Sequence, residues 1–369
     1  MDGNKTINVK IKRFMIKVLI TGVTGQDGSL MADYLLNNFN DMEIWGAYRR
    51  VSTPNHINIK HLVSNERFKP IEINITDPES INSAVAEILP DYFINFAANS
   101  FVGNSWKMPI NHMQTNAMGV LYCLESIKNI VPSCRFYNAG SSEQFGDVDY
   151  SPQDIKHPFK PRSPYGVSKC TAHHLVKVYR ESYNIFAVQG ILFNHEGVRR
   201  GEEFVTRKIT KNVARILKSL KSHNEKFEPL ELGNIYSKRD WSDAEDFVRG
   251  IWLMINQNTP KDFVLSSNET HTIKEFIELA FSYVNIKGQW VGEGIEEKFL
   301  FREYDNEFKY HLDDCVLMKI NKKFYRPAEV DLLWGCSNEA KNELNWQPQT
   351  TFKQLVEKMV DNDLKLAQT

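Results

Sequence analysis

The chain has 369 residues, of which 42% are hydrophobic and 25% are charged, and its 45 lysines and arginines nearly balance 46 aspartates and glutamates. This length predicts about two domains, and the composition is that of an ordinary globular protein, which excludes the disordered, collagen-like and repeat-array classes. The net charge of −1 indicates neither a nucleic-acid partner nor an anionic membrane partner.

The cysteines and the N-terminal segment bear on the compartment. The chain has 5 cysteines, an odd number without paired C-x-x-C spacing, which argues against a disulfide framework or a zinc site. Residues 1–15 form a basic tail without the apolar core of a signal peptide, and no later stretch is apolar enough to predict a transmembrane helix. We therefore expect a cytoplasmic protein with no metal site and no membrane partner.

From residue 16 onward, short β-branched runs alternate with longer amphipathic stretches, a pattern typical of parallel strands covered by helices. The predicted strands are residues 17–21, 43–48, 69–74, 92–97, 135–139 and 186–192. The predicted helices are residues 29–38, 78–89, 111–130 and 165–183. Asp77 as a cap and Pro78 at the first helical position mark one helix start. Residues 16–193 are thus predicted to form an α/β domain, a doubly wound parallel sheet with a nucleotide crevice at its strand ends.

The alternation of predicted strands and helices becomes less regular in residues 194–369. We interpret this part as a smaller, mixed α/β lobe that closes over the crevice. The predicted helices here are residues 204–223, 244–256 and 272–284, and the predicted strands are residues 230–233 and 263–266. Because no flexible linker separates the two parts, we expect them to pack together.

A glycine-rich turn follows the first predicted strand and leads into the first predicted helix. Glycine lets the backbone turn sharply and approach a pyrophosphate, while the helix N-terminus offers free N–H groups. The predicted cofactor residues of this turn are Gly22, Thr24, Gly25, Gln26, Asp27 and Gly28. The next strand ends in Arg49 and Arg50, where arginine suits the additional phosphate of NADP and an acidic residue would suit NAD. Asn74 and Ile75, after the third strand, are expected near the adenine.

A second constellation indicates acid–base chemistry on a hydroxyl group. Tyr165 and Lys169 are four residues apart on a predicted helix, so the ammonium is expected to lower the pKa of the phenol toward working pH. Ser141, at the end of the fifth strand, can hydrogen bond the same substrate hydroxyl. Glu143 can remove a carbon-bound proton, which a simple reductase does not require. The alternative for Glu143 is an ion pair or a cap of the following loop.

Together these residues resemble one family of extended short-chain dehydrogenase/reductases, the GDP-mannose 4,6-dehydratases. The resemblance covers nearly the whole chain from Lys17 onward and rests on the following segments: residues 22–28, 49–50, 141–143, 163–169, 191–196, 199–201, 204–208, 238–241 and 325–331. It implies a Rossmann fold and a single tightly held NADP. It also implies a GDP-sugar substrate and a homo-oligomer, either a tetramer or a dimer, in which the loop after Arg50 and residues 199 and 200 reach toward a neighbouring subunit.

The resemblance also implies residue roles. The catalytic positions are Ser141, Glu143, Tyr165 and Lys169, with serine replacing the usual threonine at 141. Further cofactor contacts are expected from Phe96, Ala97, Ala98, Ser100, Lys169, His195 and Arg200. The segments around the GDP-sugar contain Asn194, Val205, Lys208, Arg239, Arg326 and Glu329. Asn74 departs from the family's aspartate at the adenine site.

The resulting hypothesis is conversion of GDP-mannose to GDP-4-keto-6-deoxymannose and water by internal hydride transfer through bound NADP. Tyr165 would take the proton of the 4-hydroxyl, and Glu143 would remove the carbon 5 proton before water leaves carbon 6. Three alternatives remain open: a 4,6-dehydratase of another GDP-sugar such as GDP-manno-heptose, a nucleotide-sugar epimerase or reductase, and a cofactor-binding regulatory protein without catalysis.

Overall fold

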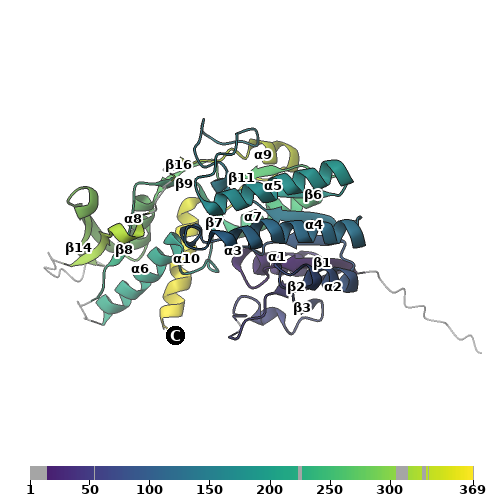
Figure 1. Ribbon diagram of the computed structural model, residues 1–369. Coiled ribbons are helices and arrows are strands. Elements are labelled where there is room, and N and C mark those ends of the chain that lie inside the picture. The colour runs from purple at the N-terminus through teal and green to yellow at the C-terminus, as the bar shows by residue number, and fades with distance from the viewer. Residues whose placement is uncertain are drawn as a thin grey trace, which may run out of the picture.

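The computed structural model describes residues 15–53, 55–222, 227–304, 315–325, 330 and 332–368. A parallel sheet with helices on both faces lies on one side of the molecule, and a second unit of helices and short strands lies on the other (Figure 1). The predicted α/β class and the doubly wound sheet are confirmed.

The central sheet has seven strands in the order β11-β6-β5-β4-β1-β2-β3, all paired in parallel. Their bounds are β1 (Ile16–Thr21), β2 (Met42–Tyr48), β3 (Phe68–Glu72), β4 (Tyr92–Asn95), β5 (Arg135–Ala139), β6 (Ala187–Leu192) and β11 (Phe263–Leu265). The chain goes from β1 to β2 on one side and later to β4 on the other. This change of direction opens a crevice at the carboxyl ends of β1 and β4.

Helices cover both faces because alternate residues of each strand point to opposite sides. Val18 and Ile20 belong to one apolar core, with α1 (Gln26–Asn38) and α7 (Ala244–Ile255). Leu19 belongs to the other core, with α2 (Pro78–Ile88), α4 (Gly119–Ile130) and α5 (Pro164–Tyr183). The start of α2 is as predicted, since the Asp77 carboxylate accepts a hydrogen bond from the Glu79 N–H at 3.0 Å.

The second unit has its own core between three helices and a four-stranded sheet. The helices are α6 (Val205–Lys221), α8 (Ile273–Tyr283) and α10 (Phe352–Gln368). The sheet has the order β13-β14-β15-β8, with β13 (Ile286–Val291), β14 (Lys298–Tyr304), β15 (Val316–Ile320) and β8 (Leu230–Leu232). Trp241, at the start of β10 (Trp241–Asp243), belongs to this core and stacks on Phe352 of α10 with 5.9 Å between ring centroids.

Short strands connect the two units. The pair β7 (Asn194–Glu196) and β10 (Trp241–Asp243) is parallel, and β9 (Lys238–Arg239) lies between β12 (His271–Thr272) and β16 (Leu332–Leu333). The helix α9 (Asn338–Leu344) packs beside β11. None of these five short strands was predicted, whereas β8 of the second unit's sheet was, as the strand at residues 230–233.

Two predicted elements differ in place or continuity. The strand predicted at 263–266 was assigned to the smaller lobe, but β11 pairs with β6 at the edge of the central sheet. The helix predicted at 111–130 is divided into α3 (Pro109–Met113), a π-helical turn at Gln114–Met118, and α4. The division at residue 193 therefore describes the chain only approximately, because β11 and α7 return to the first unit.

Three general features concern the residues that the structure describes. No helix among them combines the length and the apolarity needed to cross a membrane. No group of three or more histidine, cysteine or carboxylate side chains in this part of the chain could hold a metal ion. None of the five cysteines, all of which lie in the described part of the chain, forms a disulfide.

Candidate active site

A cavity of about 580 Å³ opens at the carboxyl ends of the central strands, where the sheet meets the second unit. All four predicted catalytic residues line it: Ser141, Glu143, Tyr165 and Lys169. The predicted cofactor residues in its wall are Asp27, Phe96, Ala98, Ser100, Lys169, His195 and Arg200. The predicted substrate residues in its wall are Asn194, Val205, Lys208 and Arg239. The structure thus gathers three groups that are far apart in the sequence.

The glycine-rich turn is shaped by close backbone contacts. Gly22 has a φ of +72°, and a Cβ there would lie 2.9 Å from the Ala97 nitrogen. A Cβ on Gly28 would lie 2.4 Å from the Gly22 oxygen. A side chain at position 22 would collide with the backbone that follows β4, and one at position 28 would push α1 away from the end of β1. The turn therefore presents bare backbone and the N-terminus of α1 to the crevice, the arrangement that suits a pyrophosphate.

A buried polar contact joins the start of α1 to β7. His195 Nδ1 donates to the Phe193 carbonyl at 2.8 Å, and Nε2 lies 3.0 Å from the Asp27 carboxylate. Burial opposes ionisation of both groups, but their mutual attraction exceeds it, so the pKa of Asp27 falls to about 2 and that of His195 rises. The rise in the pKa of His195 favours the doubly protonated ring, whose two N–H groups match the Phe193 carbonyl and the Asp27 carboxylate. Gln26 Nε2 donates to Asp27 at 3.0 Å and to the His195 carbonyl at 3.1 Å, which fixes the pair.

Ser141 and Glu143 lie on a single 3-10 turn directly after β5. Ser141 caps the turn at Ser142–Gln144, and its Oγ accepts from the Glu143 N–H at 3.3 Å. The Ser141 N–H in turn donates to Gln144 Oε1 at 2.9 Å. The turn thus holds a hydroxyl and a carboxylate side by side in the wall of the cavity, and the Glu143 side chain is only 9% exposed.

Tyr165 and Lys169 share one face of α5, as their spacing predicts. Ser163 caps this helix by accepting from the Gly166 N–H at 3.0 Å, with Pro164 at the first position. Lys169 Nζ donates to the Ala139 carbonyl at 2.8 Å and lies 5.8 Å from the Tyr165 ring centroid. Both side chains are buried. The ammonium is therefore anchored to the end of β5, below the phenol.

The pKa of Tyr165 is not shifted in the predicted direction. Burial raises it to about 12; a hydrogen bond with Ser141 and the charge of Arg200 lower it, and the Glu143 carboxylate raises it. Burial lowers the pKa of Lys169 to about 8, against the attraction of Asp27. The expected lowering of the Tyr165 pKa toward neutral pH is therefore not found, because burial has the largest effect and Lys169 is not among the groups that lower this pKa.

The far wall of the cavity belongs to the second unit and is cationic and aromatic. Lys208 Nζ lies 3.9 Å from the Phe324 ring centroid, and Lys323 Nζ lies 4.8 Å from the same ring. Burial lowers the pKa of Lys208. Two further predicted substrate residues, Arg326 and Glu329, lie outside the described residues.

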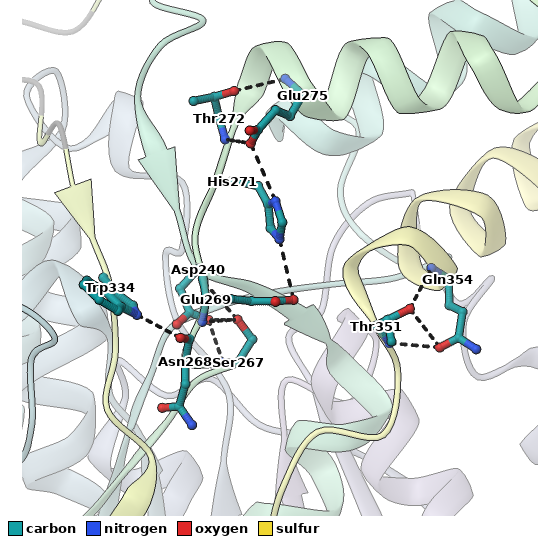
Figure 2. A network of polar contacts seen from close by, with 10 residues as sticks. All are labelled: Asp240, Ser267, Asn268, Glu269, His271, Thr272, Glu275, Trp334, Thr351 and Gln354. Carbon is teal, nitrogen blue, oxygen red and sulfur yellow. Dashed lines mark hydrogen bonds and ion pairs between the residues drawn. The ribbon is translucent and has the colours of Figure 1, made fainter.

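Asp240, which follows the cavity residue Arg239 in the chain, is fully buried. Asp240 Oδ1 accepts from the N–H and the hydroxyl of Ser267, at 2.6 and 2.7 Å, and Oδ2 accepts from the Gly335 N–H at 3.2 Å. Figure 2 shows Asp240 among the residues that follow β11, with Trp334 donating to the Asn268 carbonyl beside it. Burial raises the pKa of Asp240 to about 7. One carboxyl group thus joins three chain segments behind Arg239.

The remaining predicted cofactor residues surround the crevice without lining the cavity. Arg49 and Arg50 are exposed beyond β2, and neither has an ion pair or hydrogen bond with another described residue. Asn74 Oδ1 accepts from the Thr76 hydroxyl at 2.9 Å and so shapes the turn before α2. Ile75 is buried where a Cβ on Gly119 would meet it.

Arg199 and Arg200, expected from the resemblance to reach toward a neighbouring subunit, have partners within their own chain. Arg199 Nη2 lies 2.6 Å from Asp33, and Nη1 donates to Ser29 on α1 at 3.0 Å. Arg200 Nε lies 3.0 Å from Glu196, and its guanidinium lies 3.6 Å above the Phe204 ring. The predicted homo-oligomer stays a prediction.

Sequence reasoning missed several residues of the cavity wall. They are Phe101, Trp106, Lys107, Glu203, Phe204, Asn234, Lys323, Phe324 and Tyr325. Phe204 and Tyr325 stand inside segments that carried the resemblance, so that signal was present and not used. The others lie on loops or, for Lys323 and Phe324, on a short 3-10 turn (Lys322–Phe324), where no periodicity indicates which side chain faces the crevice.

Comparisons with known proteins identify relatives of the whole chain. The sequence profile of one family, described as GDP-mannose 4,6 dehydratase, matches residues 19–359. The GDP-mannose 4,6 dehydratase of Drosophila melanogaster is 40% identical over 94% of this chain and 86% of its own length. The human protein of that name is 39% identical over 95% and 92%, and the one from Vibrio cholerae is 38% identical over 95% of both chains.

Solved structures with low sequence identity share the fold. The dTDP-glucose 4,6-dehydratase of Bacillus anthracis in complex with NAD has a TM-score of 0.76 at 20% identity, covering 95% of this chain and 97% of its own. RMD from Pseudomonas aeruginosa, complexed with NADPH, has a TM-score of 0.72 at 20% identity, covering 95% and 100%. At this identity the likeness concerns the fold alone.

Proposed function

The chain belongs to the GDP-mannose 4,6-dehydratase family, and from this premise we propose that it converts GDP-mannose to GDP-4-keto-6-deoxymannose and water. The observation that carries the proposal is the buried carboxylate of Glu143 on the same turn as Ser141, beside Tyr165 in one cavity. A base for a carbon-bound proton is needed when water leaves carbon 6 of the sugar. Oxidation of a hydroxyl alone does not need it.

The residues at the strand ends fit a nicotinamide dinucleotide. Gly22 and Gly28 leave no space for a Cβ, so the backbone there can approach a pyrophosphate at the N-terminus of α1. Exposed Arg49 and Arg50 offer two guanidinium groups where the ribose of the adenine half is expected, which favours NADP over NAD. When bound, the dinucleotide supplies an acceptor for the hydride of carbon 4 and the donor of the same hydride to carbon 6.

The chain's own residues handle the protons. Ser141 hydrogen bonds the Tyr165 hydroxyl and orients it toward the substrate's 4-hydroxyl, whose proton Tyr165 takes. Arg200 favours the ionised phenol, and the Lys169 ammonium is anchored 5.8 Å from the ring centroid. The 4-keto group formed acidifies the proton on carbon 5. Glu143 removes that proton and returns one to the departing 6-hydroxyl, so water leaves and an enone remains. The hydride taken from carbon 4 would then return to carbon 6, and a proton equivalent to the one taken from the 4-hydroxyl would be added to carbon 5, so oxidation at carbon 4 and reduction at carbon 6 balance within one sugar.

The cationic and aromatic wall fits the other end of the substrate. Lys208 and Arg239 offer charges for the diphosphate, and Asn194 and Val205 line the same cavity. In this assignment residues 16–193 hold the dinucleotide and residues 194–369 mainly hold the GDP-sugar. The proposed roles of Arg326 and Glu329 rest on the resemblance only.

The test is incubation of the purified protein with GDP-mannose without added reductant, followed by mass spectrometry of the nucleotide sugar. The proposal predicts a product lighter by one water, and no such product from Glu143→Gln. A product of unchanged mass with a different sugar would instead favour an epimerase. Dehydration of GDP-manno-heptose but not of GDP-mannose would move the assignment to that substrate.

A further inference from the structure

A continuous chain of buried polar side chains crosses four strands of the central sheet and ends at the catalytic turn. Its members are Thr21, Asn95, Asn138, Gln189 and Gln144, each 2% exposed or less. Consecutive members are joined by hydrogen bonds of 2.5, 2.8, 2.7 and 3.0 Å. Buried amides cost free energy unless they are paired. A complete row of paired amides in an otherwise apolar sheet therefore suggests a function beyond packing.

The sheet register places four of these residues in one line. Thr21 pairs with Asn95, Asn95 with Asn138, and Asn138 with Gln189, on β1, β4, β5 and β6. Each stands two positions beyond an apolar residue of the core under α2, α4 and α5, as Asn95 stands beyond Phe93. The row therefore forms the last layer of that core, at the strand ends where the crevice opens.

The direction of the row is fixed along its length. The Thr21 hydroxyl donates to Asn95 Oδ1, and each amide nitrogen then donates to the oxygen of the next residue, as far as Gln144 Oε1. Gln144 Oε1 also accepts from the Ser141 N–H. Turning this amide over would set its NH₂ group against two donors. The catalytic turn is thus bonded to the sheet through one defined oxygen atom.

The geometry around Gly140 shows how closely this end is fitted. A Cβ on Gly140 would lie 2.8 Å from Gln144 Oε1, 2.8 Å from Gln189 Nε2 and 2.6 Å from the Gly190 oxygen. There is therefore no room for a side chain at position 140, and the turn cannot move away from β6 without breaking the bonds from Gly140 to Gly190 and from Gln189 to Gln144. Ser141 and Glu143 follow at once in the chain.

We propose that Gln144 and Gln189 are positioning residues, which hold the turn after β5 so that Ser141 and Glu143 meet the substrate in register with Tyr165. The role assigned to this turn rests on the proposed dehydratase function. Neither glutamine lines the cavity, so they act through the Ser141 backbone and not by touching substrate. The other end of the row is Thr21, directly before Gly22, which ties the catalytic turn to the glycine-rich turn.

The decisive variant is Gln144→Met, which keeps the volume of the side chain and removes the acceptor of two hydrogen bonds. Misplacing catalytic groups by about 1 Å costs about 100-fold in rate, so we expect a fall in kcat of about 10- to 100-fold with little change in KM. The matched control is Gln153→Met. Gln153 is equally buried and accepts from the Trp334 N–H at 3.0 Å, but its side chain bonds Trp334, Tyr150 and Ser151 and not the catalytic turn. This control should keep its kcat.

Two further variants separate positioning from general damage. Gln144→Glu retains both accepted hydrogen bonds and should recover most of the lost kcat. If Gln144 acts through Gln189, the loss in the Gln144→Met and Gln189→Met double variant should be smaller than the product of the two single losses. A kcat for Gln144→Met within about twofold of the parent, or an equal loss in the Gln153 control, overturns the proposal.

Hydrogen exchange at the peptide containing Ser141 gives a readout without turnover. Exchange there should become faster in Gln144→Met and stay unchanged in Gln153→Met, because only the first removes the acceptor of the Ser141 N–H. Unchanged exchange in Gln144→Met contradicts the positioning role. If the parent protein does not dehydrate GDP-mannose, the proposed function fails by itself, and the exchange result still decides this inference.

Discussion

Replacement of Asp240 by asparagine should change how the stability of this protein depends on pH. Asp240 is fully buried behind Arg239, and its partners are the uncharged donors of Ser267 and Gly335. Burial raises its pKa from 3.8 to about 7. A carboxyl group with a raised pKa binds its proton more tightly in the folded state, so its favourable contribution is complete below about pH 4 and is lost as the pH rises through 7.

The size of the effect follows from that difference in pKa. A difference of about 3 corresponds to about 4 kcal/mol once the group is ionised in both states. Between about pH 5 and pH 8, the part of the free energy of unfolding that depends on Asp240 should fall by about 2 to 3 kcal/mol. Asparagine does not titrate. The variant should therefore gain this amount relative to the parent over the same interval.

Urea unfolding of both proteins at the two pH values measures this directly. The informative quantity is the stability of Asp240→Asn minus that of the parent, because other titrating groups cancel in this difference. The same exchange at the exposed Asp147 controls for the substitution itself. If the difference for Asp240→Asn is the same at both pH values, the carboxyl is not destabilised by its burial and the reasoning is refuted.

Three other substitutions test separate parts of the account. Arg200→Met should move the pH dependence of kcat to higher pH, because the guanidinium lowers the pKa of Tyr165; an unchanged profile measured across the alkaline range would contradict this. Arg49→Ala with Arg50→Ala should weaken NADP binding far more than NAD binding in titration calorimetry, whereas equal losses for both would remove the argument for NADP. Asp363→Asn leaves the buried guanidinium of Arg207, whose Nη2 lies 2.7 Å from that carboxylate, without its counter-charge, and should cost about 3 to 5 kcal/mol in urea unfolding; a loss below about 1 kcal/mol, typical of a surface pair, would show that the pair is not buried in solution.

The central sheet was predictable because its signal is local. Four of the six predicted strands, at residues 17–21, 43–48, 92–97 and 186–192, are mainly apolar runs, as expected for parallel strands that are buried on both faces. The three residues of β11 are too few to show any period. Their place beside β6 depends on a pairing between segments about 70 residues apart, and a short apolar run cannot indicate that.

Many residues of the candidate site could be predicted from the sequence, but their contacts and pKa shifts could not. Asp27 and His195 were both expected at the cofactor, but their hydrogen bond joins residues 168 positions apart and follows only from the folded topology. The spacing of Tyr165 and Lys169 gave their common helix face. It could not give the burial that raises the pKa of the phenol, because burial is set by the second unit and by the loops around the cavity.

The role of Gln144 could not be predicted from the sequence either. In the sequence it is one polar residue in a turn, and nothing in its neighbours indicates that its oxygen accepts from Gln189 on β6. Side-chain partners between strands depend on register, and register is fixed only when the whole sheet assembles. The residues that support the catalytic groups were therefore harder to predict than the catalytic groups themselves.

The most direct test of the proposed function follows one hydrogen atom of the substrate. GDP-mannose deuterated at carbon 4 is incubated with the purified protein, and the product is analysed by mass spectrometry and NMR. The account predicts that the deuterium of carbon 4 appears on carbon 6 of a product lighter by one water. Deuterium retained at carbon 4, or lost to solvent, would contradict it.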